Sequence, residues 1–349
     1  MAATTIPRAL RKGDTIAFIS PSARLNQIFP HPIGRAKAWL EHLGYHVKII
    51  FNISPPKSFR DSVLQRCEEI HSAFRDTSVK AVICTVGGSH SNELLPHLDY
   101  DLIRANPKIF CGYSDITVLH YAFFTQANLR TFYGPAALTE LGDYPQPLPF
   151  TADHFLAMLT EEGSPSGKSM GPVPRSLEWA PGLPEFGPQE VSRELVPSPK
   201  WTWLRPGRAT GRIFGGCLPS MLHLSGTKFW PDYRRRILLL ETPMGEKMED
   251  PLPLVVVQSQ MADLVNLGVM EVISGLVVGR PYGFDEKGRE EFAQMIADQC
   301  YGTDFPILLN VDVGHSDPIL TMPLDALCSL DSGKDEFGIL EVGVIIGET

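Results

Sequence analysis

Short apolar runs and helical patterns alternate along the first 135 residues of the chain. The apolar runs lack strict alternation of polar and apolar positions, which is typical of strands covered on both faces. They fall at residues 15–20, 46–51, 79–86, 107–113 and 130–134. The stretches between them carry apolar residues at helical spacing. This order predicts an α/β domain built on a parallel sheet, over residues 1–162.

The pattern changes between residues 163 and 206. Nine prolines fall in this segment, and neither helical nor strand periodicity is sustained. We therefore predict a linker or a long irregular loop, and a connection of this length is more often functional than filler. Its tryptophans either line a binding pocket or pin the loop to a domain. They are Trp179, Trp201 and Trp203.

Strand-like and helical stretches alternate again from residue 207 to residue 349. Helices are expected at about 251–266 and 286–301. The expected strands become more frequent toward the end of the chain, at 208–216, 235–242, 274–280, 305–314, 324–330 and 338–346. We therefore predict a second, mixed β/α domain over this range.

Charge and hydropathy narrow the classes of partner. The chain has 349 residues, of which 31 are basic and 40 acidic, so its formal net charge is −9. An acidic balance without a cluster of lysines or arginines argues against nucleic acid or an anionic membrane surface as the main partner. No apolar stretch approaches the roughly 20 residues of a membrane helix. We expect a cytoplasmic protein that binds a small molecule or a peptide.

The motifs typical of metal and dinucleotide sites are missing from the sequence. The six cysteines are scattered, and none has the paired spacing of zinc ligands, so reduced and buried thiols are expected. The chain has no HExxH motif and no GxGxxG after the first expected strand. We therefore expect neither a metal nor another cofactor.

Three polar side chains follow buried strands, where α/β sheets bind their ligands. Ser114 follows the run 107–113, Glu241 ends the run RRILLLE, and His315 follows the run 305–314. A serine hydroxyl needs a neighbouring imidazole to take its proton, and the imidazole needs a carboxylate to fix its tautomer. Together these residues supply a nucleophile, a base and an orienting acid.

Each of these residues also has a purely structural interpretation. Ser114 stands where helix capping alone favours serine, Glu241 could be a surface carboxylate, and His315 a turn residue. The turn GYSDI has Gly112 before the serine, but Ile116 stands where a nucleophile elbow has its second glycine. The sequence therefore has only one of the two glycines of the elbow motif.

A glycine pair follows the expected strand 79–86. Gly87 and Gly88 place backbone without side chains at the carboxyl edge of that strand, where an amide could face the same reacting atom as Ser114. The alternative is a plain glycine turn. A phosphate-binding loop is disfavoured, since GGSHSNELL lacks the lysine and the spacing of such a loop.

These residues lie in motifs that resemble the LD-carboxypeptidase family of serine peptidases, and within it the microcin C immunity branch. The motifs follow one another in the order of the family from the first strand to about residue 331. They are TVGGSHSNELLPHLDYDLI (85–103), CGYSDITVLH (111–120), TFYGPA (131–136), ATGRIFGG (209–216), ILLLET (237–242) and GHSDPILTMPL (314–324).

The resemblance implies a flavodoxin-like N-terminal domain, a mixed β/α C-terminal domain and an active site between them. Ser114 would be the nucleophile, Glu241 the orienting acid and His315 the base, while the backbone of Gly88 and Asp115 would form the oxyanion hole. The family cleaves an amide next to a free carboxylate, in a murein tetrapeptide or, in the immunity branch, in a peptidyl or aminoacyl nucleotide. The resemblance also implies a homodimer.

Four further residues are predicted to contact the substrate. Gly87 and Ser89 belong to the glycine-pair loop, and Trp179 takes the place of an aromatic residue that stacks on the base of the substrate in the immunity branch. Cys217 stands where similar proteins usually have asparagine, so the contact made there differs from that of the family.

The sequence thus predicts a serine hydrolase that cleaves an amide bond of a small peptide or an aminoacyl-nucleotide conjugate. Two other hypotheses remain open. One is a cysteine hydrolase similar to amidotransferases, with Cys84, Cys111 or Cys217 as the nucleophile. The other is a binding protein that sequesters such ligands without cleaving them.

Overall fold

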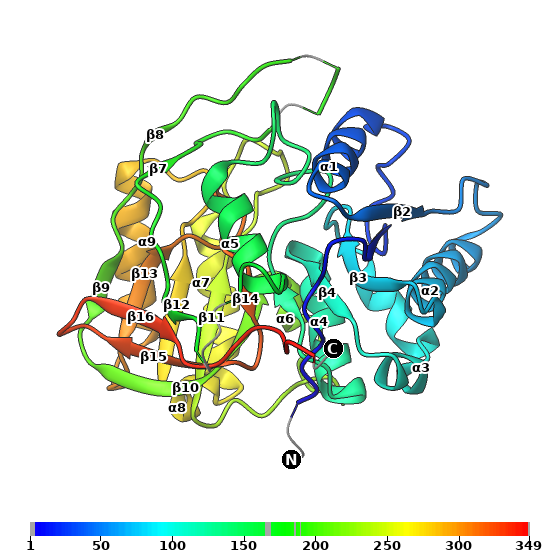
Figure 1. The fold of residues 1–349 in the computed structure, drawn as a ribbon. Coiled ribbons are helices and arrows are strands. Elements are labelled where there is room, and N and C mark those ends of the chain that lie inside the picture. Colours follow the sequence, from blue (N-terminus) through cyan, green and yellow to red (C-terminus); the bar gives the residue numbers. More distant parts are fainter. Residues whose placement is uncertain (1–3, 165–168, 185, 189, 348–349) are drawn as a thin grey trace.

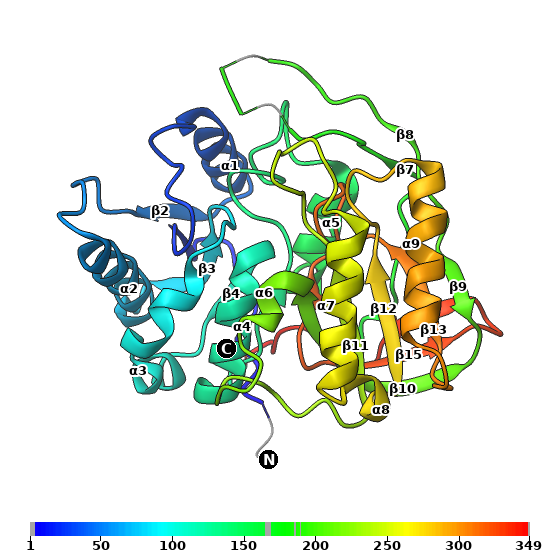
Figure 2. The ribbon, with the colours of Figure 1, turned by 180° about the vertical axis from the view of Figure 1, so that it is seen from behind.

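Two β-sheets, built mainly by the first and the last parts of the chain, lie side by side in the molecule (Figures 1 and 2). The computed structural model describes residues 4–164, 169–184, 186–188 and 190–347. The first sheet is parallel except at one edge, and the second is mixed. The predicted fold class, a parallel-sheet α/β domain followed by a mixed β/α domain, is confirmed.

The first sheet has the strand order β14-β5-β4-β3-β1-β2 within the described residues. Its strands are β1 (Thr15–Ile19), β2 (His46–Ile50), β3 (Val79–Cys84), β4 (Ile109–Gly112), β5 (Phe132–Tyr133) and β14 (Met322–Pro323). The helices of this part of the chain are α1 (Pro30–His42), α2 (Phe59–Arg75), η1 (Ser91–His97), α3 (Tyr100–Ala105), η2 (Ser114–Ile116), α4 (Thr117–Ala127) and α5 (Pro149–Leu159).

Helix α2 shows how the local sequence fixes an element. Ser58 caps the helix, because its hydroxyl accepts a hydrogen bond from the amide of Asp61 at 3.1 Å. Apolar residues at helical spacing, among them Ile70 and Phe74, are fully buried, and α2 packs against β1, β2 and β3. Phe59, which fits the same apolar pattern, is instead exposed.

The second sheet has the order β6-β16-β15-β10-β11-β12-β13-β9 within the described residues, and its four parallel strands lie together between antiparallel ones. Its strands are β6 (Gly171–Pro172), β9 (Thr202–Arg205), β10 (Arg208–Cys217), β11 (Arg236–Glu241), β12 (Gly275–Gly279), β13 (Ile307–Val311), β15 (Leu327–Asp331) and β16 (Glu336–Ile339). The helices of this part are α6 (Leu218–Leu222), α7 (Leu254–Asn266), α8 (Val269–Val272) and α9 (Glu286–Gln299).

The segment 163–206 contains more regular structure than its sequence indicated. β6 and β9 form the two edges of the second sheet, and β7 (Glu178–Trp179) pairs with β8 (Val196–Pro197). These strands are two to four residues long, which is too short for a period of two to stand out. The last expected strand also differs, since β16 ends at Ile339 and not at residue 346.

One strand crosses from the second half of the chain into the first sheet. β14 follows the loop that carries His315 and pairs with β5, with Met322 opposite Tyr133. The chain between β13 and β14 therefore runs from one sheet to the other. As a result, the carboxyl ends of β4, β11 and β13 are brought toward the same region between the two sheets.

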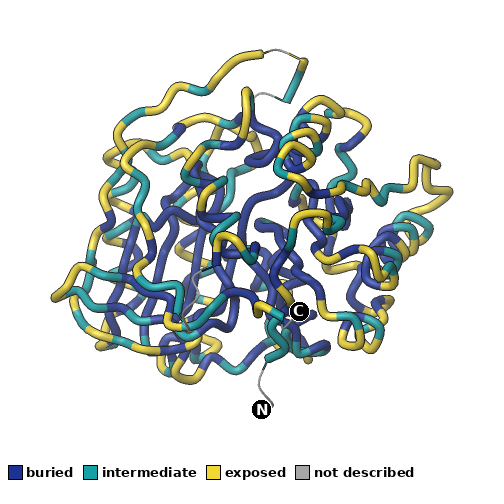
Figure 3. Tube along the Cα trace, in the orientation of Figure 1, coloured by how far each residue is buried: buried dark blue, intermediate teal, exposed yellow. Residues whose placement is uncertain are grey.

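The buried residues concentrate on the strands of both sheets (Figure 3). β4, β11 and β12 are buried over their whole length, whereas the edge strand β2 is largely exposed. This explains why runs such as RILLLE lack alternation. Among the described residues, no helix is both long and apolar enough to cross a membrane.

Gly215 in β10 provides a test of this packing. Its φ is 153°, and a Cβ atom added there would lie 1.9 Å from the carbonyl oxygen of Leu239 in β11. We expect Gly215→Ala to lower the free energy of unfolding by about 3 kcal/mol or more. Gly34→Ala in α1, where an added Cβ meets nothing within 4 Å, should raise it by about 0.5–1 kcal/mol. Urea unfolding of both variants measures the difference, and equal stabilities would contradict the expectation.

Candidate active site

Ser114 lies in a strained turn between β4 and α4. Its φ is +64°, a conformation that residues other than glycine rarely adopt and that often marks functional sites. The elbow forms although Ile116 occupies the second glycine position of the motif. A glycine of the loop that follows β3 gives the required space, because a Cβ added at Gly87 would lie 2.6 Å from Cβ of Ser114.

The structure brings Ser114, His315 and Glu241 into one hydrogen-bonded chain. Nε2 of His315 lies 2.9 Å from Oγ of Ser114, and Nδ1 lies 2.7 Å from Oε2 of Glu241. A carboxylate can only accept, so Nδ1–H donates to Glu241, which leaves Nε2 free to accept the proton of the serine. This is the relative geometry of a nucleophile, a base and an orienting acid.

Glu241 is completely buried, and each of its oxygens has a partner. While Oε2 binds His315, Oε1 accepts a hydrogen bond from the hydroxyl of Tyr133 at 2.5 Å. The same hydroxyl accepts a hydrogen bond from the amide of Ser114 at 3.1 Å. Tyr133 therefore links the acid to the backbone of the serine. The TFYGPA motif contains this tyrosine, but its sequence gave no sign of the contact.

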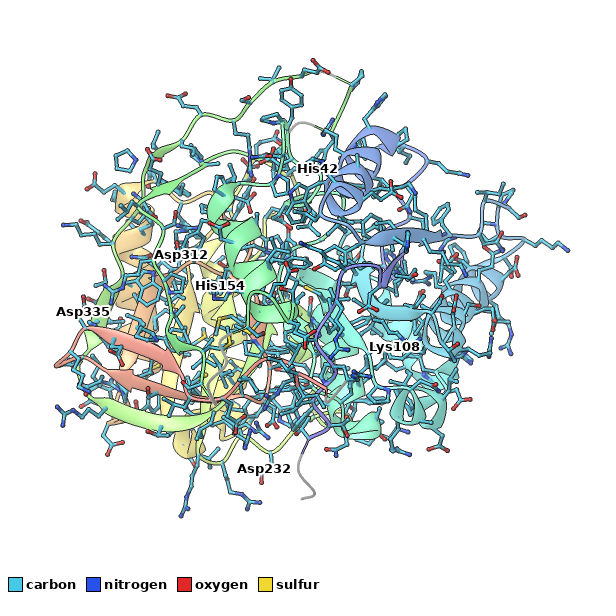
Figure 4. The ribbon with its side chains drawn as sticks, viewed as in Figure 1. His42, Lys108, His154, Asp232, Asp312 and Asp335 are labelled. Atoms are coloured by element: carbon cyan, nitrogen blue, oxygen red, sulfur yellow. The ribbon has the colours of Figure 1, made fainter. Side chains whose placement is uncertain are left out.

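Two features fix the loop that carries His315. A Cβ added at Gly314 would lie 2.7 Å from Oε2 of Glu241, and the φ of Gly314 is +100°, so only glycine allows this approach. The buried guanidinium of Arg280 binds the carboxylate of Asp312 at 2.8 Å and the carbonyl oxygen of Ser316 at 2.9 Å. Asp312 lies in the part of the molecule built on the second sheet (Figure 4).

The residues whose amides are predicted to form the oxyanion hole, Gly88 and Asp115, line the same cavity as Ser114. A Cβ built on Gly87 would be 2.8 Å from Oγ of Ser114 and 3.4 Å from the amide nitrogen of Asp115, so Gly87 closely approaches both residues. Gly88 has a φ of 145°, and a Cβ there would lie 2.5 Å from Oγ of Ser22. Both glycines are thus required by close approach, beyond the needs of a plain turn.

The side chain of Asp115 holds this loop in place. Its Oδ2 accepts hydrogen bonds from the hydroxyl of Ser22 at 2.6 Å and from the amides of His90 and Ser91 at 2.9 and 2.8 Å. These bonds tie the loop that follows β3 to the turn after β4. The carboxylate of Asp115 is thus engaged in holding this loop, and the predicted role of Asp115 in the oxyanion hole concerns only its backbone amide.

A cavity of about 410 Å³ lies at Ser114 and His315. Its lining includes five residues for which substrate contacts or a place in the oxyanion hole are predicted: Gly87, Gly88, Ser89, Asp115 and Cys217. Much of the remaining lining is apolar and comes from both halves of the chain: Leu25, Phe29, Leu138, Leu183, Phe186 and Met244. The cavity therefore suits a ligand with a substantial apolar or aromatic part.

Trp179 lies outside the lining of this cavity. Its ring faces the guanidinium of Arg280, 5.8 Å from the ring centroid. The aromatic residue of the proline-rich segment that lines the cavity is Phe186, whose ring centroid is 5.4 Å from that of Phe29. The sequence indicated an aromatic contact from this segment, but nothing in the local pattern favoured Phe186 over the tryptophans.

The cysteines are poorly suited to nucleophilic attack. Burial raises the pKa values of the Cys84 and Cys111 thiols, and burial together with the charge of Glu241 raises that of Cys217. A thiol acts as a nucleophile in its ionised form, which these surroundings disfavour. The hypothesis of a cysteine hydrolase is therefore disfavoured. Among the described residues, no group of three or more potential ligands is arranged to hold a metal ion.

Tyr113 contacts both the ring of His315 and a buried carboxyl group. The ring of Tyr113 meets that of His315 edge-on at a centroid distance of 5.0 Å, and its hydroxyl donates to Oε1 of Glu140 at 2.8 Å. Burial, and then the charge of Asp317, raises the pKa of Glu140 to about 7. No local pattern in the sequence indicates this buried carboxyl group.

Models of a known family match both halves of the chain. The LD-carboxypeptidase N-terminal domain matches residues 16–134, and the LD-carboxypeptidase C-terminal domain matches residues 210–330. The fold and the matches define a serine-type carboxypeptidase. The chain belongs to the LD-carboxypeptidase family.

Several proteins are similar to this chain over almost its full length, and some of them have known structures. A candidate carboxypeptidase of Vibrio cholerae is 32% identical, with 95% of this chain and 96% of the relative covered. A candidate murein peptide carboxypeptidase of Bacillus subtilis is 29% identical, with 98% and 96% covered. A mutant of the microcin C7 self-immunity protein MccF of Escherichia coli, solved with adenosine monophosphate, is 26% identical, with a TM-score of 0.88 and 98% and 100% covered. MccF has also been solved with glutamyl sulfamoyl guanosine.

Removal of the Tyr133 hydroxyl tests its link between acid and nucleophile. Tyr133→Phe leaves Oε1 of Glu241 and the amide of Ser114 without this partner, so we expect the free energy of unfolding to fall by about 1–3 kcal/mol. The reaction of Ser114 with a fluorophosphonate probe should also slow. Tyr121→Phe, which removes a buried hydroxyl bonded to Tyr233, is the matched control. It should lower stability without slowing the labelling, and equal labelling of all three proteins would contradict the link.

The raised pKa of Glu140 predicts a pH-dependent stability. Between about 4.5, its ordinary value, and about 7, the folded protein keeps a proton that the unfolded chain has released. The folded state therefore loses stability as the pH rises through this window. Relative to Glu140→Gln, the wild-type protein should become less stable from pH 4.5 to 7 in urea unfolding. Glu290→Gln on the exposed side of α9 is the control, and the same difference with both variants would contradict the assignment.

Proposed function

We propose that the protein is a serine carboxypeptidase that cleaves an amide bond of a small peptide or an aminoacyl-nucleotide conjugate through Ser114, His315 and Glu241. The observation that carries the proposal is the continuous chain of hydrogen bonds from Ser114 through His315 to the buried Glu241. Family membership supports the class of reaction.

The first half of the reaction forms an acyl-enzyme. His315 takes the proton of Ser114 at Nε2 while Oγ attacks the carbonyl carbon of the substrate, and Glu241 stabilises the resulting imidazolium through Nδ1. The amides of Gly88 and Asp115 donate to the oxyanion of the tetrahedral intermediate. His315 then gives its proton to the leaving amine, and the carbon–nitrogen bond breaks.

The second half releases the acyl group. Water loses a proton to Nε2 of His315 and attacks the ester formed at Ser114, and the same amides stabilise the second oxyanion. The proton returns to Oγ when the ester bond breaks, so the enzyme is regenerated. The tautomer fixed by Glu241 serves both halves, since Nε2 must accept a proton in each.

The apolar and aromatic lining of the cavity supports a conjugate that carries a ring system. Phe29 and Phe186 offer two ring faces for such a group. The complexes of MccF with adenosine monophosphate and glutamyl sulfamoyl guanosine support the same class of ligand. A murein tetrapeptide is the other substrate of this reaction type to test, because the relatives include a candidate murein peptide carboxypeptidase.

Replacement of the nucleophile tests the reaction directly. The protein is incubated with a murein tetrapeptide and with an aminoacyl-sulfamoyl adenosine, and products are identified by mass spectrometry. We expect wild type to cleave one of them and Ser114→Ala to lower turnover by about 10⁴-fold or more, because the nucleophile is lost. Ser78→Ala, the same change at an exposed serine, is the control.

A fluorophosphonate probe separates the three hypotheses. The serine mechanism predicts labelling of wild type and none of Ser114→Ala. Equal labelling of the two proteins would refute Ser114 as the nucleophile. Inactivation by iodoacetamide would favour a cysteine hydrolase, and recovery of both ligands unchanged after long incubation would favour a binding protein.

A further inference from the structure

Arg193, in the proline-rich segment, joins three separate parts of the chain. Nη2 of Arg193 lies 2.6 Å from Oδ2 of Asp143, and Nη1 lies 2.6 Å from Oδ2 of Asp317. Nε of Arg193 donates to the same oxygen of Asp143 at 2.9 Å, and Nη1 also donates to the carbonyl oxygen of Gly182. Asp143 follows β5 of the first sheet, whereas Asp317 lies two residues after His315.

The ion pairs of Arg193 are buried, unlike most ion pairs on a protein surface. The side chains of Arg193, Asp143 and Asp317 are 7%, 2% and 6% exposed. Paired charges away from water hold a fixed geometry, and loss of one partner leaves the others uncompensated. Arg193 is therefore suited to fixing the position of the segment that carries it.

That segment forms part of the wall of the active-site cavity. Leu183 and Phe186 line the cavity, and the ring of Phe186 packs against that of Phe29, another lining residue. At the start of the segment, the amide of Ala180 donates to the carbonyl oxygen of Asp317 at 2.9 Å. The wall is thus attached at Ala180, at Gly182 and at Arg193, and two of these attachments use Asp317.

We propose that Arg193 is a positioning residue for substrate specificity: through Asp143 and Asp317 it holds Leu183 and Phe186 in the cavity wall. It thereby sets the affinity for the part of the substrate that is remote from the bond to be cleaved. This inference rests on the proposed function, because it takes the cavity at Ser114 as the substrate site. Arg193 touches neither Ser114 nor the cavity itself, so its effect on the reaction passes through the wall.

The proposal predicts that changes at Arg193 weaken binding of a large ligand much more than they slow the reaction of Ser114 with a small probe. The fluorophosphonate probe is small and reports on Ser114 and His315, whereas a larger ligand that protects Ser114 from the probe reports on the whole cavity. Adenosine monophosphate and a murein tetrapeptide are both tried as protecting ligands, and the one that protects wild type at the lower concentration is used. The half-protecting concentration is then measured for each variant.

Arg193→Met keeps much of the side-chain length and removes the charge. We expect it to raise the half-protecting concentration by about tenfold or more, because the wall loses its fixed position before binding. The rate of labelling without ligand should change far less. Arg193→Lys, which keeps the charge without the planar fork, should fall between wild type and Arg193→Met. Arg175→Met, in the same segment but paired with the exposed Asp335, is the matched control and should behave as wild type.

A double-mutant cycle tests whether Arg193 acts through Phe186. Phe186→Ala removes the ring from the wall and should also weaken protection. If Arg193 acts by holding this ring, the half-protecting concentration of the double variant should be little higher than that of Phe186→Ala alone. Additive losses would overturn the assigned route from Arg193 to the cavity. Thermal unfolding shows which variants are folded, and Arg193→Lys keeps the test valid if Arg193→Met is unstable.

The remaining outcomes separate the inference from the proposed function. If Arg193→Met slowed the labelling of Ser114 by as large a factor as it raised the half-protecting concentration, Arg193 would have a general structural role. That result would overturn the inference. Labelling of wild type without protection by either ligand would also overturn it, while leaving the serine mechanism intact. Absence of labelling in wild type would instead contradict the proposed function.

Discussion

The buried carboxylate of Glu241 binds groups that belong to both halves of the chain. Glu241 ends a strand of the second sheet, yet one of its oxygens binds Tyr133 of the first sheet and the other binds His315. An ionised carboxylate without water is costly unless each oxygen is bound. The two sheets must therefore be held in one relative position for this charge to be satisfied. Because Tyr133 also binds the amide of Ser114, the same constraint fixes the position of this serine.

The close approaches around this carboxylate explain the glycines of the site. Gly314 lets the His315 loop pass beside Glu241, and Gly87 gives room for the strained turn at Ser114. In each case the crowding group belongs to a different segment of the chain. The elbow motif is thus completed in space, by a glycine of the loop that follows β3, although it is incomplete along the sequence.

The features that could be predicted from the sequence are those that depend on local patterns. Buried strands appear as apolar runs, and Ser114, Glu241 and His315 stand out because each follows such a run. Tyr133 and Glu140 act through contacts with residues far away along the chain, and no local pattern reports such contacts. The proline-rich segment lacked periodicity, so its short strands were missed. The choice between Trp179 and Phe186 also depended on how the segment folds back over the cavity, which its composition does not determine.

The crossing of β14 into the first sheet bears on how the molecule can be divided. Met322 and Pro323 complete the sheet beside β5, and the amide of Leu324 donates to the carbonyl oxygen of Thr131. The amide of Ala9, near the start of the chain, donates to the carbonyl oxygen of Ile345, near its end. The two halves are consequently not interchangeable modules. A chimera that joined the first half to the second half of a relative would inherit a foreign edge strand along β5, which contains the tyrosine that binds Glu241.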